Sequence, residues 1–149
     1  MLAYDGMNEI SQGFARALFS AFPNWEHLAR VANDDKTGAN HIEVDVAQDG
    51  TDRLLHLSTA DNEITIGFEQ WHTHVGPFLG ITMAESVATA MSIIEDFIAE
   101  RAVVKVTHRD SAWIVSSLEY VVAPSEPIPN SSTKVFSWRR TYDDIVQAP

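Results

Sequence analysis

The chain of 149 residues contains no cysteine, and only 10 Lys and Arg residues stand against 21 Asp and Glu. The absence of cysteine excludes disulfides, thiolate metal sites and a cysteine nucleophile, and it is typical of a reducing cytoplasm. The shortage of basic residues gives a formal net charge of -11. Such a charge disfavours nucleic acids and anionic membranes, because both are bound through Lys and Arg, and it favours a basic protein partner.

The motifs that mark common enzymes are also missing. The sequence has no Gly-x-Ser-x-Gly elbow and no HExxH pattern, and the segment 76–80 lacks the lysine and glycine spacing of a phosphate-binding loop. No stretch approaches the roughly 20 apolar residues of a membrane span, and the N-terminus lacks a signal-peptide pattern. The sequence therefore predicts a cytoplasmic, non-enzymatic protein with no cofactor, and it leaves the oligomeric state open.

Hydrophobic periodicity predicts a single α+β domain over residues 1–149. An apolar residue every fourth position indicates an N-terminal helix that Pro23 ends, and Trp25, Leu28 and Val31 could continue it within a helical lobe over 8–32. From residue 40 the period changes to two, which predicts a three-stranded meander over 40–75. The third strand of this meander contains Ile64, Ile66 and Phe68 and leads into Trp-His-Thr-His.

A second helix is predicted over 82–101, because Thr82 and Glu85 have the spacing of a capping box. Its expected buried stripe leaves Ser86 outside and consists of Val87, Met91, Ile94 and Ile98. Further strands are expected at 102–107, 112–122 and 134–142. The simplest arrangement is one antiparallel sheet of about five to six strands, with the N-terminal and central helices packed on one face.

The string Trp71-His72-Thr73-His74 at the end of the third predicted strand is the most unusual in the chain. In an extended strand His72 and His74 point to the same side, where two imidazoles can chelate zinc or a similar cation. His56, or Glu43 with Asp45, could supply further ligands. The histidines can equally hold the loop by hydrogen bonds while Trp71 packs under a helix. A metal-dependent enzyme or a ligand-binding module that uses His72 and His74 is therefore the alternative function.

Acidic residues are concentrated in the first half of the chain, where residues 1–75 contain 12 acidic and 4 basic side chains. Acidic strands and turns can imitate a phosphate backbone and so block a basic, nucleic-acid-binding enzyme, with an aromatic residue as central anchor. The predicted partner-binding residues are Glu43, Asp45, Asp61, Glu63, Glu69 and Trp71.

The segment Ile64-Thr65-Ile66-Gly67-Phe68, leading into Trp71-His72-Thr73-His74, resembles small bacterial immunity proteins of contact-dependent growth inhibition and related polymorphic toxin systems. The resemblance covers this strand, the Trp-His-Thr-His end and the Thr82-capped helix. It implies a cytoplasmic inhibitor that binds the C-terminal toxin domain of an effector, often a nuclease, and covers or distorts its active site. In such a protein no residue is catalytic, and the resemblance assigns no interface residue.

Overall fold

The computed structural model describes residues 4–34, 37–122 and 125–148, and it confirms the predicted α+β class. The contacts within the chain define two compact units, residues 1–93 and residues 94–149. Each unit contains its own antiparallel sheet, where the sequence suggested one sheet for the whole chain. Among the described residues, no helix combines the length and the apolar character needed to cross a membrane.

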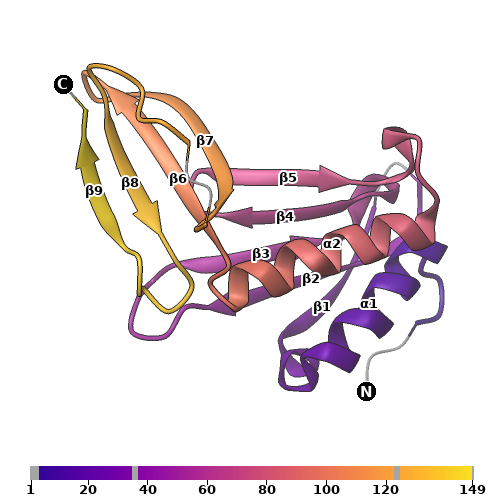
Figure 1. The fold of residues 1–149 in the computed structure, drawn as a ribbon. Helices are drawn as coiled ribbons and strands as arrows, with labels where there is room; N and C mark the ends of the chain where they lie inside the picture. Colours follow the sequence, from indigo (N-terminus) through magenta and orange to yellow (C-terminus); the bar gives the residue numbers. More distant parts are fainter. Residues whose placement is uncertain (1–3, 35–36, 123–124, 149) are drawn as a thin grey trace. The chain divides into compact units, whose positions relative to one another are not determined.

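The sheet of the N-terminal unit, here called sheet A, has five strands in chain order (Figure 1). They are β1 (Ala29–Asn33), β2 (Asn40–Ala47), β3 (Leu54–Ser58), β4 (Ile64–Phe68) and β5 (Trp71–Val75). Every neighbouring pair is antiparallel. The alternating pattern of β2 to β4 turns one face inward, and its buried side chains are Ile42, Val44, Val46, Leu55, Leu57, Ile64, Ile66 and Phe68. The predicted meander is confirmed in β2, β3 and β4, but residues 40–75 also contain a fourth strand, β5, and β1 adds a strand at the other edge.

The N-terminal helix α1 (Glu9–Ala21) begins as its sequence requires, because the Asn8 side chain accepts a hydrogen bond from the Ser11 N–H at 2.9 Å. It packs against β2 and β4. After Pro23 the chain forms the 3-10 helix η1 (Pro23–Leu28). The predicted helical turn at Val31 is wrong, since Val31 lies in β1 and pairs with Ile42. A β-branched residue readily joins a strand once an edge partner is present.

The predicted third strand of the meander is two strands in the structure. Glu69 adopts a φ of 54° and forms a tight turn with Gln70, which folds β5 back on β4 so that Phe68 pairs with Trp71. Nothing in the apolar pattern predicted this turn, because Glu is not a residue that favours positive φ. The Trp-His-Thr-His string is therefore an edge strand rather than the end of β4.

The central helix α2 (Met83–Ile98) confirms the capping box. Thr82 N donates to Glu85 Oε2 at 2.7 Å, and Glu85 N donates to Thr82 Oγ1 at 3.1 Å. The helix ends before Glu100, which has a φ of 57°. Ser86 was predicted outside the buried stripe, but it is fully buried, and its hydroxyl is satisfied there by donating to the Thr82 carbonyl at 2.8 Å.

The sheet of the C-terminal unit, here called sheet B, has the strand order β7-β6-β8-β9. Its strands are β6 (Ala102–Arg109), β7 (Ala112–Tyr120), β8 (Ser132–Phe136) and β9 (Asp144–Gln147). The predicted strand over 134–142 is interrupted after Phe136. The buried Glu100 carboxylate accepts hydrogen bonds from the N–H groups of Arg139 and Thr141 at 2.6 and 3.3 Å, and these contacts hold a turn instead.

Candidate functional site

The outer face of sheet A gathers polar side chains from all five strands, and we take it as the candidate functional site. In β2 the alternation that buries Val44 turns Glu43 and Asp45 to the opposite face. The strand register sets Arg30 of β1 opposite Glu43, and it sets His56 of β3 opposite Asp45. Side chains that are directly opposite on one face lie within contact distance. The two acids therefore meet basic groups from both neighbouring strands.

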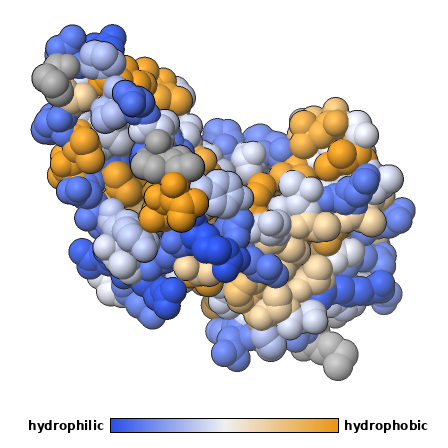
Figure 2. Space-filling view, viewed as in Figure 1, coloured by the Kyte–Doolittle hydropathy of each residue, from blue (hydrophilic) through white to orange (hydrophobic). Residues whose placement is uncertain are grey.

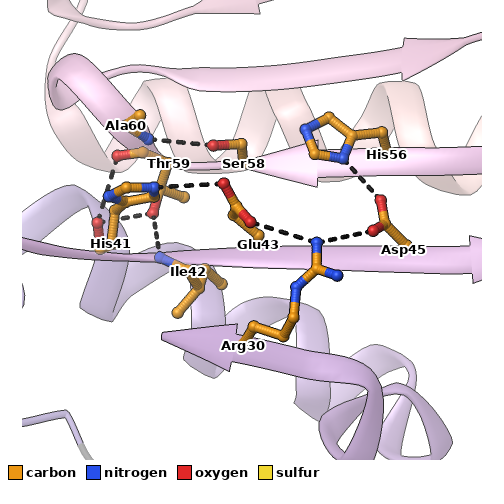
Figure 3. Close-up of polar contacts among 10 residues, drawn as sticks. Arg30, His41, Ile42, Glu43, Asp45, His56, Ser58, Thr59 and Ala60 are labelled. Atoms are coloured by element: carbon orange, nitrogen blue, oxygen red, sulfur yellow. Dashed lines mark hydrogen bonds and ion pairs between the residues drawn. The ribbon is translucent and has the colours of Figure 1, made fainter. Parts of the chain in front are cut away.

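Arg30 bridges the two acids of β2 (Figure 3). Its Nη2 lies 3.2 Å from Glu43 Oε2 and 2.8 Å from Asp45 Oδ2, and His56 Nδ1 lies 2.7 Å from Asp45 Oδ1. The hydrogen bond from His56 is the largest influence on Asp45 and lowers the pKa of its carboxyl. Partial burial opposes this effect, and the positive charge of Arg30 adds to it. Asp45 is thus held as a carboxylate in a fixed orientation.

A second carboxylate and histidine pair lies at the β4–β5 edge of the same face. Glu63 Oε1 is 2.6 Å from His74 Nδ1, and the Thr65 hydroxyl is 3.1 Å from the same nitrogen. His72 lies two residues earlier on β5, and the centroids of the two imidazoles are 5.2 Å apart with nearly perpendicular planes. The prediction that His72 and His74 point to the same side is confirmed.

Gly67 separates the two clusters. The register places Asp45, His56, Gly67 and His72 in one row across the sheet. A Cβ built on Gly67 would lie 3.9 Å from the His56 Cβ and 3.7 Å from the His72 Cβ. No side chain therefore stands between these two histidines.

His41 closes the Glu43 end of the site (Figure 3). Its ring is buried, and Nε2 faces Glu43 Oε1 at 3.6 Å. Nδ1 has no hydrogen-bond partner within the described part of the chain. The ring thus borders the acidic cluster without the close contact that His56 makes to Asp45.

The remaining predicted acids lie at turns rather than on the face itself. Asp61 is exposed in the turn η2 (Ala60–Asn62), with a φ of 54°. Glu69 lies in the β4–β5 turn, 3.5 Å from Arg53 Nε. The structure thus brings Glu43 and Asp45 together, sets Glu63 beside His74, and leaves Asp61 and Glu69 at the ends of strands.

Two expectations about the Trp-His-Thr-His string need correction. Trp71 is only 8% exposed and lies on the buried face, so its ring is not available as a surface anchor. His56 shares the outer face with His72 and His74 but does not join them. Over residues 4–34, 37–122 and 125–148, no three His, Asp or Glu side chains come close enough to hold a metal ion.

The structure reveals an exposed apolar turn that the sequence reasoning missed. Phe78 and Leu79 lie in the 3-10 turn η3 (Pro77–Leu79) and are 60% and 55% exposed. Figure 2 shows apolar residues projecting at this connection between β5 and α2. Gly76 packs closely here, because a Cβ on it would lie 3.1 Å from both the Glu63 Cβ and the Phe78 ring. In the sequence this turn is marked only by an apolar pair between Gly76-Pro77 and Gly80, and such a pair is too short to predict a helix or a strand.

A separate polar cluster lines a cavity of about 100 Å³ in the C-terminal unit. Lys105 Nζ lies 2.7 Å from Glu119 Oε2, and both side chains are largely buried. Ser125 donates to Glu119 through its N–H at 2.9 Å and its hydroxyl at 2.6 Å, and Ser117 adds a bond at 3.0 Å. Burial raises the pKa of Glu119, but these bonds and Lys105 together lower it to about 2. The cluster is internally satisfied, so we assign it to stability.

No family model matches the chain, and neither a curated protein nor a solved structure matches it. The assignment of function therefore depends on the geometry and charge of the surface described above.

Proposed function

We propose that the protein is a cytoplasmic immunity protein, which binds and neutralises the basic C-terminal toxin domain of a contact-dependent inhibition or related effector. The toxin domain is proposed to be a nuclease. The observation that carries the proposal is the juxtaposition of an acidic sheet face with the exposed apolar turn of Phe78 and Leu79. The resemblance of residues 64–74 to immunity proteins supports the same conclusion.

Charge favours capture of a basic partner by the N-terminal unit. Residues 1–93 contain 13 acidic and 4 basic side chains, a net charge of -9, whereas residues 94–149 contain 8 and 6, a net charge of -2. A field of one sign accelerates encounter with a partner of opposite sign and depends on ionic strength. The binding face is therefore assigned to sheet A rather than to sheet B.

The contacts within the face also hold its acids in position. Arg30 and His56 fix Asp45, and His74 fixes Glu63, so less side-chain freedom remains to be lost on binding. Arg30 carries one positive charge, whereas the two carboxylates that it bridges carry two negative charges. The remaining negative charge can attract basic groups of a partner.

Phe78 and Leu79 take the anchor role that the sequence reasoning gave to Trp71. Interfaces obtain most of their affinity from a few apolar or aromatic side chains that become fully desolvated, surrounded by polar contacts. The close packing of Gly76 against both Glu63 and Phe78 sets an aromatic anchor directly beside an acidic group. In this arrangement the apolar turn supplies affinity and the acids supply specificity and association rate.

The test measures binding to the toxin domain encoded by the adjacent gene, with kinetics at about 0.05 M and about 0.5 M NaCl. We expect the association rate to fall at least about tenfold at the higher salt, and Phe78→Ala to weaken the affinity at least about tenfold. Trp113→Ala is the matched control, because Trp113 is 57% exposed in the C-terminal unit, and it should leave the affinity unchanged. Full toxin activity at saturating protein would refute the proposal.

A further inference from the structure

The edge strand β5 presents two imidazoles side by side. His72 and His74 are both exposed, whereas Trp71 and Val75 at the ends of the strand are buried. Their positions i and i+2 place them on one face, and their ring centroids are 5.2 Å apart at an interplanar angle of 83°. Neither ring fills the core of sheet A, because both side chains are exposed.

Glu63 and Thr65 both contact the same ring nitrogen of His74. Glu63 Oε1 lies 2.6 Å from His74 Nδ1, and the Thr65 hydroxyl shares a hydrogen bond with this nitrogen at 3.1 Å. Nε2 lies on the opposite side of the ring from these contacts and is the nitrogen that a metal ion would bind. This is the arrangement in which a histidine binds a metal, with a carboxylate holding the other ring nitrogen.

The spacing of the rings matches chelation of one cation. A metal about 2.0–2.1 Å from an imidazole nitrogen lies about 3.2 Å from the ring centroid, so two rings bound at a tetrahedral angle have centroids about 5.2 Å apart. The observed separation is 5.2 Å. The ring centroids therefore already lie at the separation that joint binding of one cation requires.

From these observations we propose that His72 and His74 bind one borderline divalent cation of the zinc class, with Glu63 as the positioning residue for His74. Imidazole suits such cations, whereas Mg²⁺ and Ca²⁺ require oxygen ligands. Because no third protein ligand is in place among the described residues, the remaining coordination positions are open to water or to a donor from a partner. The proposal does not require the immunity function, although both use Glu63, and it involves no catalytic step.

The experiment titrates the full chain with ZnCl2 by calorimetry and follows the imidazole nitrogens by NMR. We expect one zinc per chain and selective shifts of the His72 and His74 ring signals, with no binding of Mg²⁺ under the same conditions. His72→Ala and His74→Ala should each weaken zinc affinity at least about tenfold, and Glu63→Gln should weaken it about 10- to 100-fold.

His56→Ala is the matched control. His56 is as exposed as His74, at 44% against 42% of the side chain, and its Nδ1 also lies beside a carboxylate, 2.7 Å from Asp45 Oδ1 against 2.6 Å from His74 Nδ1 to Glu63 Oε1. It lies on β3 and should not contribute, so its removal should leave the zinc affinity unchanged. An equal loss in His56→Ala, or unchanged affinity in the His72→Ala and His74→Ala variants, would overturn the assignment. Circular dichroism of each variant separates loss of a ligand from loss of the fold.

Discussion

Replacing Glu119 by Gln should change how the stability of the protein depends on pH. The Glu119 carboxylate receives hydrogen bonds from Ser117 and Ser125 and pairs with Lys105 at 2.7 Å. All of these contacts favour the charged form and outweigh the burial that opposes it. Gln has nearly the shape of a protonated Glu, so the variant resembles the acidic form of the protein at every pH.

The magnitude follows from the pKa. The Glu119 pKa falls from 4.5 to about 2 in the folded chain. One pKa unit corresponds to about 1.4 kcal/mol, so the charged carboxylate contributes about 3 kcal/mol to the free energy of unfolding. Because the folded pKa is the lower one, this contribution is complete above about pH 5 and is lost as the pH falls towards about 2.

Urea unfolding of wild type and Glu119→Gln across this pH range provides the assay. The wild-type protein should be about 3 kcal/mol more stable at pH 7, and the difference should shrink towards zero near pH 2. Glu95→Gln removes the same charge from an exposed position of α2 and should follow the wild-type curve. If the difference between wild type and Glu119→Gln does not change with pH, the assignment of the lowered pKa to this cluster is wrong.

Two further substitutions test local features of the fold by urea unfolding. Thr82→Ala removes the side chain that caps α2 through the Glu85 N–H, and it should lower the free energy of unfolding by about 1 kcal/mol. If the free energy of unfolding falls by no more than the experimental error, the cap is not formed. Ser11→Ala removes a buried hydroxyl that bonds Thr59 Oγ1 at 2.7 Å, and it should cost about 1–3 kcal/mol, whereas Ser20→Ala on the exposed side of α1 should cost little. Equal effects at Ser11 and Ser20 would contradict this interpretation.

Local sequence patterns predicted the elements whose causes are themselves local. The Thr82 and Glu85 capping box and the alternation in β2 depend on residues within one element, and both were found as expected. The edge strands were missed because their causes lie elsewhere in the chain. Val31 becomes a strand residue by pairing with Ile42, and the break after Phe136 depends on the carboxylate of Glu100.

The candidate site was predictable only within a single strand. Alternation correctly placed His72 and His74 on one side, but it gave no information on which strands lie opposite. The strand register decides that Asp45 meets His56 and that Gly67 lies between His56 and His72. Burial of Trp71 likewise depends on the Glu69 turn, which pairs it with Phe68. Register and turns are therefore what sequence reasoning lacked.

The two proposals share Glu63, and this sets the sign of their coupling. A divalent cation at His72 and His74 adds positive charge beside Glu63, which weakens the attraction of the face for a basic partner. By linkage, a bound basic partner must then lower the affinity of the protein for the cation by the same factor. If the partner instead donates a ligand to an open coordination position, the cation and the partner should each raise the affinity of the protein for the other. The coupling between cation and partner therefore reports whether the partner reaches β5 itself or only the acids beside it.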